Sequence, residues 1–311
     1  MINEQKENNV YVLMSTYNGQ RYIEEQINSI LNQENCKINL IVRDDGSTDK
    51  TKSILKKYAE KGLLKFVEDG MNLGPAQSFF RLVELAPSNG FYAFADQDDY
   101  WNPDKMSRAI RLLNKNDADI PLVYYSNAEV VDQNLNSLNR RVYEKEQTPT
   151  PEKILCGYGV QGCTMVFNNC LREFFLKEDI CNLDVEMHDF FLCDVCVACG
   201  GKVVFDNVPT MKYRQHENNV LGFDAKTSKM KKIKKRICEL FTEAEKSIAD
   251  DADILMRYES YMSQTGKTLV VNVQQYKKSF AIRIQLAASL MKGGFEKKEV
   301  LKAFKILMKK A

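Results

Sequence analysis

Four consecutive polar residues, Asp96-Gln97-Asp98-Asp99, follow the apolar run FYAFA and bring three carboxylates together. Carboxylates this close repel one another, and a fold keeps such a cluster beside buried sequence when a cation neutralises it. Oxygen ligands favour Mg²⁺ or Mn²⁺ over zinc, and phosphate oxygens of a substrate commonly complete the coordination of these ions. The alternative is an exposed acidic turn that caps the helix expected after Asn102-Pro103.

Two further polar clusters follow apolar runs earlier in the chain. Asp44-Asp45 comes after INLIVR, and the stretch STYNG, residues 15–19, comes after VYVLM. The chain contains no G-x-x-x-x-G-K-[ST] loop, the common device for binding a triphosphate. We therefore expect a nucleotide bound at these clusters to be held by carboxylates, hydroxyls and a metal ion.

The elements around these clusters alternate between strand and helix. Short apolar runs at residues 9–14, 38–43, 63–67 and 91–95 predict strands, and apolar residues at helical spacing predict helices at 22–33, 51–61 and 73–86. This alternation is typical of an α/β fold in which helices cover both faces of a mainly parallel sheet. Ligands of such sheets bind outside the carboxyl ends of the strands, which is where the polar clusters lie.

The second half of the chain continues with three predicted strands, at residues 122–131, 164–169 and 202–208, and a helix at 187–199 that Gly200-Gly201 ends. From Lys226 onward the sequence becomes helical and rich in lysine. Residues 1–225 carry 24 basic and 33 acidic side chains, whereas residues 226–311 carry 20 and 9. We predict a catalytic domain over 1–225 and a basic helical region over 226–311, whose charge favours an anionic partner or a solvated helical face.

Three cysteines, Cys193, Cys196 and Cys199, lie at C-x2-C-x2-C spacing on the helix predicted at 187–199. An iron–sulfur site would need a fourth cysteine where Val203 stands, and a structural zinc site would need a second pair of ligands, for which Cys163 or Cys181 could be recruited. Steps of three residues instead favour the buried face of a core helix, where cysteine packs as a small apolar residue.

No apolar run reaches the roughly 18 to 20 residues that a membrane-spanning helix needs, and the start MINEQKENNV is too polar for a secretory signal. We expect a cytoplasmic protein whose nine cysteines are reduced thiols.

The order of these motifs resembles the inverting family 2 glycosyltransferases of the GT-A fold, and in particular the bacterial rhamnosyltransferases that build cell-surface polysaccharide. The resemblance covers residues 9–222 and rests on six ordered segments: VLMSTYNGQRYIEEQINSILNQ, VRDDGSTDKT, NLGPAQSFF, FADQDDYWNPDK, HDFF and YRQHENN. It implies a GT-A nucleotide-binding sheet, flanked by helices, with a helical C-terminal extension.

The resemblance implies a role for each matching residue. Ser15, Thr16 and Tyr17, together with Asp45, would hold the nucleoside of a nucleotide-sugar, and Asp45 would accept a hydrogen bond from the base.

The acidic cluster would serve the diphosphate of the same donor. Asp96 and Gln97 would bind the donor, while Asp98, Asp99 and His216 would hold a Mg²⁺ or Mn²⁺ ion that bridges its two phosphates.

The catalytic base of the family is the Asp of a Glu-Asp pair at the start of a helix, and here that pair reads His188-Asp189. Asp189 would take the proton from an acceptor hydroxyl as it attacks the anomeric carbon. An N-cap role for the same carboxylate is compatible with catalysis.

Four residues are weaker candidates for contacts with the sugar or the acceptor. Trp101 is the only tryptophan and either stacks on a sugar or packs. Gly162 marks either a close approach of the backbone to the acceptor or an ordinary turn. His188 either binds the diphosphate or the acceptor, or it orients its neighbour Asp189. Arg214 faces either phosphate or solvent.

The resemblance implies a nucleotide-sugar donor, with dTDP-L-rhamnose as the first candidate and a UDP-hexose as the second. It also implies a glycan acceptor, for which a lipid-linked glycan is the narrower alternative. The basic C-terminal region would hold the enzyme on the anionic inner membrane leaflet or form a homodimer, and no nucleic acid partner is expected. Two other readings are a sugar-phosphate nucleotidyltransferase, which STYNG does not suit, and a cysteine-metal binding module without enzymatic activity.

Overall fold

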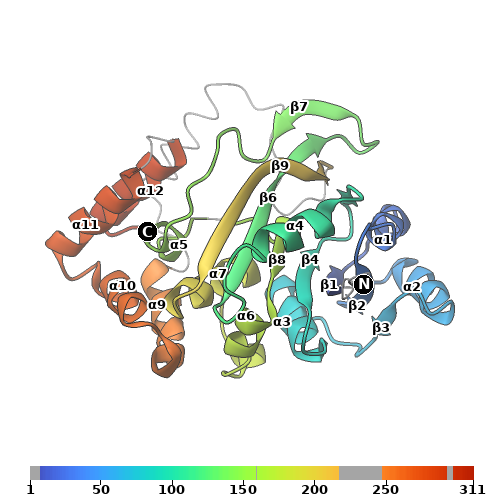
Figure 1. The fold of residues 1–311 in the computed structure, drawn as a ribbon, viewed down its shortest axis with the longest axis horizontal. Helices are drawn as coiled ribbons and strands as arrows, with labels where there is room; N and C mark the ends of the chain where they lie inside the picture. Colours follow the sequence, from blue (N-terminus) through green and yellow to red (C-terminus); the bar gives the residue numbers. More distant parts are fainter. Residues whose placement is uncertain (1–7, 159, 217–246, 293–296) are drawn as a thin grey trace, which may run out of the picture.

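The structure, a computed structural model, describes residues 8–158, 160–216, 247–292 and 297–311. Its centre is a nine-stranded sheet in the order β3-β2-β1-β4-β8-β6-β9-β5, with β7 paired to β6 (Figure 1). The strands are β1 (Asn9–Thr16), β2 (Lys37–Asp44), β3 (Lys65–Val67), β4 (Phe91–Ala95), β5 (Tyr100–Trp101), β6 (Leu122–Val131), β7 (Ser137–Arg141), β8 (Met165–Phe167) and β9 (Lys202–Arg214).

Helices connect these strands and cover the sheet. They are α1 (Ile23–Leu31), α2 (Thr51–Glu60), α3 (Pro75–Leu85), α4 (Lys105–Leu113), α5 (Pro151–Leu155), α6 (Asn169–Phe175), α7 (His188–Ala198), α9 (Ile248–Leu255), α10 (Gln264–Gln275), α11 (Phe280–Met291) and α12 (Lys297–Leu307). Short 3₁₀ turns occur at η1 (Gly162–Thr164), η2 (Ile180–Asn182) and η3 (Met256–Tyr261). The predicted α/β fold with a helical C-terminal extension is confirmed.

The sheet has a parallel half and a mixed half. β3, β2, β1 and β4 are all parallel, as the helical crossovers between them require. Beyond β4 the pairing changes, because β8 is antiparallel to both β4 and β6, and β5 is antiparallel to β9. The prediction of parallel pairing therefore describes the half formed by β3, β2, β1 and β4, whereas the other half combines these antiparallel pairs with the parallel pair of β6 and β9.

The run FYAFADQDDYW, expected as one strand with a polar end, forms two strands. β4 ends at Ala95, and β5 begins at Tyr100 and pairs with β9 near the opposite edge of the sheet. The acidic loop between Ala95 and Tyr100 is thus fixed at both ends by different strands.

Alternate residues of β1 face two apolar cores. Val10, Val12 and Met14 pack with buried residues of α1 and α4, whereas Leu13 faces the opposite core, which includes α3 and α7. This period of two is what a strand covered on both faces requires. β1 is therefore packed on both faces up to the point at which it ends.

The C-terminal helices belong to the same core as α3 and α7. Tyr258, Val270, Leu286 and Ile306 are buried in one cluster with residues of the first 225 positions. The lysine-rich run at 226–246 lies outside the described residues, so the boundary predicted at residue 225 stays a prediction. Within the described ranges, no helix has the length and apolar character needed to cross a membrane.

Candidate functional site

The carboxyl ends of β1 and β2 meet at one edge of the sheet. Thr16 and Asp44 are paired in register, and the Thr16 hydroxyl donates to Oδ1 of Asp44 over 3.2 Å. Oδ2 of Asp44 accepts from the backbone N–H groups of Gly46 and Ser47, and this turn is possible because Gly46 adopts a φ of 90°. Asp44 therefore holds the end of its strand in place.

Arg43 is fully buried and organises the next loop. It binds both carboxylate oxygens of Asp69 through Nε and Nη2, and its Nη1 donates to Oδ1 of Asp45 over 2.6 Å. Its Nη1 also donates to the Ser78 hydroxyl, which lies 2.7 Å from the hydroxyl of Ser15. This buried arginine fixes the loop after β3 against the end of β1.

Both carboxylate oxygens of Asp45 accept hydrogen bonds from the protein itself, which the sequence did not predict. Its Oδ1 also accepts from the backbone N–H of Leu73, and its Oδ2 accepts from that of Gly74. With a residue exposure of only 5%, the carboxylate shapes the loop at 73–74. A contact with a nucleobase would have to share these oxygens, so that predicted role stays a prediction.

Tyr17 and Gln97 join the β1 loop to the acidic loop. The Gln97 amide accepts from the backbone N–H of Tyr17 and donates to its carbonyl, each over 2.9 Å. The Tyr17 side chain is half exposed, so its ring is open to a flat partner such as a base. Ser15, Thr16, Tyr17, Asp45 and Gln97 thus lie on one rim, as the motif positions predicted.

The acidic loop turns its carboxylates in two directions. Oδ2 of Asp98 lies 2.7 Å from Nε2 of His216, within direct hydrogen-bond distance. Asp99 instead points inward: its Oδ1 accepts from the backbone N–H of Arg214, and its Oδ2 is buried without a hydrogen-bond partner among the described residues. Asp98 and His216 are therefore placed together, and Asp99 stands behind them.

A second group of possible ligands lies on the buried side. Asp96, Asp99 and Cys163 each offer a ligand atom, and these atoms lie within 4.8 Å of one another. Burial, and then the nearby carboxylates of Asp98 and Asp189, raise the pKa of Asp96 to about 7. Burial likewise raises the pKa of Asp99 well above its usual value.

These observations test whether a divalent cation suits the site. The carboxylates of Asp96, Asp98 and Asp99 repel one another, and a cation would relieve that repulsion. At the Asp98–His216 pair the donors are carboxylate oxygen atoms and one imidazole nitrogen, whereas the unpartnered Oδ2 of Asp99 and the Cys163 thiol lie on the buried side. The residues present therefore fit Mg²⁺ or Mn²⁺.

Arg214 is buried and positions the acidic loop, which corrects the expectation that it faces phosphate or solvent. Its Nε donates to the Asp98 carbonyl and its Nη1 to the Gln133 carbonyl, each over 2.7 Å, and its Nη2 pairs with Glu25. The guanidinium also stacks 4.4 Å from the ring centre of Tyr22. A buried arginine needs this many partners, and they all lie in the protein.

Trp101 is also buried, with an exposure of 1%, so of its two expected roles the structure shows packing and not stacking on a sugar. Its ring packs under Nζ of Lys105, which lies 4.8 Å from the ring centre. Burial lowers the pKa of Lys105 to about 8, and Asp99 and Cys163 act against that shift. The buried indole therefore anchors the chain directly after the acidic loop.

Asp189 lies in the first turn of α7, beside η1. Its Oδ2 accepts from the backbone N–H of Gly162 over 2.8 Å. Burial raises the pKa of Asp189 to about 6, although hydrogen bonds from Gly162 and Phe190 lower it. The thiol of the next residue of η1, Cys163, lies within 4.8 Å of carboxylate oxygens of Asp96 and Asp99, so η1 joins the predicted base to the acidic loop.

His188 packs among aromatic rings, which corrects the expectation that it binds diphosphate, whereas its contact with an acceptor stays a prediction. Its ring stacks on Phe79 at 4.0 Å and meets the edge of Phe94 at 4.8 Å. Burial lowers its pKa to about 3, so the imidazole is neutral at physiological pH and offers no positive charge to a diphosphate. The orienting role remains, because the ring fixes the start of α7.

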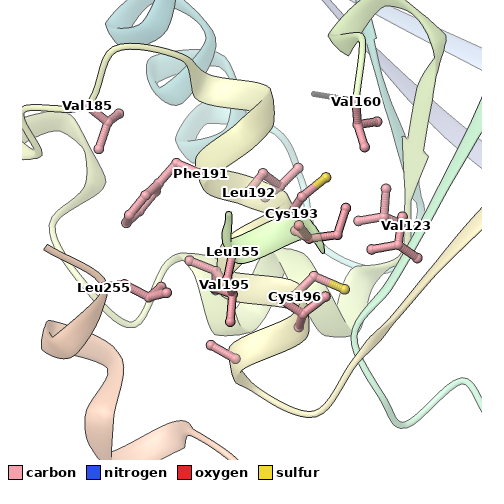
Figure 2. Close-up of a cluster of buried hydrophobic side chains, with 14 of the residues drawn as sticks. Val123, Leu155, Val160, Val185, Phe191, Leu192, Cys193, Val195, Cys196 and Leu255 are labelled. Carbon is pink, nitrogen blue, oxygen red and sulfur yellow. The ribbon is translucent and has the colours of Figure 1, made fainter. Parts of the chain in front are cut away.

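Cys193 and Cys196 on α7, and Cys199 directly after it, are buried among apolar side chains. Figure 2 shows Cys193 and Cys196 in a cluster with Val123, Leu192 and Val195. Burial raises the thiol pKa of all three, to about 12 for Cys199, and so disfavours the thiolate that a metal needs. The predicted packing role is what their surroundings favour.

The stretch GYGVQG, residues 157–162, has the glycine spacing of a dinucleotide-binding fingerprint. It follows α5 instead of a strand, and Gly162 begins a 3₁₀ turn, so the strand and helix that the fingerprint needs are not in place. Gly162 serves Asp189 instead, since a Cβ there would lie 3.0 Å from Oδ2 of Asp189 and 3.1 Å from Nε2 of His188.

Sequence motifs did not identify Arg43, Asp69, Glu25 or Cys163 as parts of the site. An arginine directly after the apolar run INLIV and before Asp44 was one available signal, because a charged residue inside a buried strand needs a partner. Glu25 and Asp69 carry no such signal, since their roles depend on residues far away in the sequence.

Comparisons with known proteins complete the description. Residues 11–175 match the family described as Glycosyl transferase family 2. The chain is 30% identical over 274 residues to the dTDP-rhamnosyl transferase RfbG of Shigella flexneri, and the match covers 84% of this chain and 90% of that protein.

Two solved structures share the fold. The first is S. aureus TarS 1–349 in complex with UDP-GlcNAc, with a TM-score of 0.54 at 16% identity over 96% of this chain and 90% of that chain. The second is the mannosyltransferase PcManGT from Pyrobaculum calidifontis in complex with GDP-Man and Mn²⁺, with a TM-score of 0.53 at 15% identity over 98% and 87%. At these identities the likeness concerns the fold alone.

Proposed function

The chain belongs to glycosyl transferase family 2, and from that premise we propose that it moves L-rhamnose from dTDP-L-rhamnose to a hydroxyl of a glycan acceptor. Membership makes it a glycosyltransferase and removes the nucleotidyltransferase and the cysteine-metal module from consideration. A relative named as a dTDP-rhamnosyl transferase supports the donor, and a UDP-hexose is the second candidate.

One observation carries the proposal. η1 links Asp189 to the acidic loop: Gly162 binds the carboxylate of Asp189, and its neighbour Cys163 lies with Asp96 and Asp99. A proton acceptor and a site for a diphosphate are thus held on one rigid turn. The parallel half of the sheet supplies the rim on which a nucleoside would lie.

Asp189 would act as general base. With a pKa of about 6 it is ionised near neutral pH yet basic enough to take a proton in the transition state. As it removes the proton from the acceptor hydroxyl, that oxygen forms the new bond to the anomeric carbon and the bond to the diphosphate breaks. Attack from the side opposite the diphosphate inverts the configuration.

The remaining site residues would bind and orient the donor. Tyr17 presents its half-exposed ring to the base, while the reciprocal pair with Gln97 keeps the two loops in register. Asp98 and His216 would hold the divalent ion, with Asp99 behind them. That ion would stabilise negative charge on the leaving diphosphate.

We assign donor and acceptor chemistry to residues 1–225. The acceptor is proposed as a glycan, with a lipid-linked glycan as the more specific possibility.

A panel of donors tests the proposed activity. The protein is incubated with dTDP-L-rhamnose, UDP-glucose, UDP-GlcNAc and GDP-mannose, with Mg²⁺ or Mn²⁺, and donor hydrolysis and transfer are followed. We expect turnover of dTDP-L-rhamnose above the other donors, lost in Asp98→Ala. Preference for a UDP-hexose would replace the donor assignment, and retention of configuration in the product would contradict the mechanism.

A further inference from the structure

The two C-terminal helices expose an unusual amount of apolar side chain. Of the twelve large apolar side chains exposed in the described part of the chain, six lie on or directly after α11 and α12. They are Phe280, Ile284, Val300, Phe304, Leu307 and Met308. The most exposed is Phe280, at 63%, and single exposed apolar residues are common on protein surfaces, whereas such a concentration marks a binding surface.

These side chains form one stripe on each helix. Phe280 and Ile284 are four residues apart on α11, and Val300, Phe304 and Leu307 follow at intervals of four and three on α12. Residues at these intervals share one face of a helix. The opposite faces are buried in the core, for example at Leu286, Leu290 and Ile306. Each helix is therefore apolar on its outward side as well as on its inward side.

The two stripes lie at the same end of a helical hairpin. α11 and α12 pack against each other (Figure 1), and the Tyr276 hydroxyl, before α11, donates to the carbonyl of Ala311, after α12. The start of α11 is thus beside the end of α12. Phe280 and Ile284 accordingly lie at the end of the hairpin that also carries Phe304 and Leu307.

Basic residues surround this apolar surface. Residues 276–311 contain ten lysines and arginines but only two acidic residues. Of these two, Glu299 is buried in an ion pair with Lys153 over 2.6 Å. Lys277, Lys278 and Lys309 are exposed at the end of the hairpin that carries Phe280 and Phe304, and Lys292 is exposed at the other end. An apolar face bordered by lysines is typical of a helix that lies in the interface of an anionic bilayer.

We propose that the α11–α12 hairpin docks the protein on an anionic lipid surface. Phe280, Ile284, Phe304 and Leu307 would enter the boundary between headgroups and acyl chains, and the exposed lysines would contact headgroup phosphates. A second copy of the chain fits the surface less well, because a two-fold contact would bring one set of lysines against the other. The proposal goes beyond the assigned transfer reaction, since it does not depend on the donor.

The test uses the full chain and two kinds of vesicle, phosphatidylcholine alone and phosphatidylcholine mixed with phosphatidylglycerol. Binding is measured by co-sedimentation at increasing salt. We expect binding to the mixed vesicles only, weakened by salt because headgroup attraction is screened. The double variant Phe280→Glu/Phe304→Glu should bind at least tenfold more weakly, because burial of two aromatic side chains is lost.

Matched variants separate the apolar and the charged contributions. Leu63→Glu alters an apolar residue of similar exposure on a remote turn, so it should bind like the wild type. Lys277→Gln/Lys278→Gln should weaken binding by about fivefold for each lysine that contacts the surface. The control Lys57→Gln/Lys61→Gln removes two lysines on and directly after α2, and it should leave binding unchanged.

Three results would overturn the proposal: equal binding to neutral vesicles, unchanged binding of the double phenylalanine variant, or no binding of the wild type. A fourth is a wild-type dimer in sedimentation velocity that Phe280→Glu/Phe304→Glu converts to a monomer, since the surface would then join two copies. Because the readout is vesicle binding, failure of the transfer assay would not contradict this proposal. Failure of vesicle binding would likewise not contradict the proposed transfer reaction.

Discussion

Gly162 donates its backbone N–H to Oδ2 of Asp189 over 2.8 Å, and the space beside its Cα is closed by the same carboxylate and by the His188 ring. Gly162 is thereby held against His188 and Asp189, which lie 26 and 27 positions later in the sequence. The turn that fixes the proposed base cannot accept a side chain without moving it.

Gly162→Ala should therefore lower kcat. A Cβ would lie 3.0 Å from Oδ2 of Asp189, so the carboxylate must shift, and a displacement of about 1 Å of a catalytic group can cost on the order of 100-fold in rate. Steady-state kinetics with a saturating donor measures the change. The matched variant Gly62→Ala strains a remote turn, where φ is 70°, and should lower the melting temperature without changing kcat. An unchanged kcat in Gly162→Ala would show that η1 does not position the base.

The rate should fall as the pH drops below about 6. Asp189 has a pKa raised to about 6 and acts only when ionised, so protonation removes the base and the rate declines about tenfold per pH unit. A profile of kcat between about pH 5 and 8 shows this acidic limb. His188→Phe should keep the limb at reduced activity, because burial lowers the His188 pKa to about 3 and the histidine does not titrate in this range. A flat profile would exclude a carboxylate base with this pKa.

A divalent cation should stabilise the folded protein through Asp98 and His216. A ligand that binds only the native state raises the melting temperature, by an amount that grows with its concentration. Thermal unfolding is followed with increasing Mn²⁺, in the presence of dTDP. Asp98→Ala and His216→Ala should each lose most of the shift, because their side chains lie 2.7 Å apart at the proposed site. Glu68→Ala, an exposed carboxylate elsewhere, should keep it; equal shifts in all variants would place the ion at another site.

Arg43→Met should destabilise the fold by roughly 3 to 5 kcal/mol, the usual cost of removing one partner from a buried ion pair. Asp45 and Asp69 would lose their shared partner, and the loop at 69–74 would lose its attachment. Urea denaturation measures the change. Lys56→Gln breaks an exposed pair with Glu68 and should cost less than about 1 kcal/mol. Equal effects would mean that the Arg43 network contributes little.

The sequence predicts what depends on local pattern. The strands before Ser15, Asp44 and Asp96 are recognisable because apolar runs end in polar residues, and parallel pairing then brings those ends to one edge. The rim of the site follows from this alone. The pair Asp98–His216 follows only through the resemblance to a family, since no local signal links positions so far apart.

The directions of individual side chains depend on long-range pairing that local sequence does not reveal. Arg214 is buried because β9 brings it beneath the acidic loop, against Glu25 of α1. Trp101 turns inward because residues 100–101 form a strand that pairs with β9. On a free loop Arg214 and Trp101 would have faced solvent, and the motif alone does not distinguish the two cases.

The central claim, that Asp189 is the base of a glycosyl transfer, is tested most directly with Asp189→Asn. This variant keeps the shape of the side chain and can retain the hydrogen bond from Gly162, but it cannot take a proton. Transfer from dTDP-L-rhamnose and binding of dTDP are measured side by side for the variant and the wild type. The account predicts a rate lowered by roughly 100-fold to 10,000-fold with nucleotide affinity unchanged; transfer at the wild-type rate would contradict it.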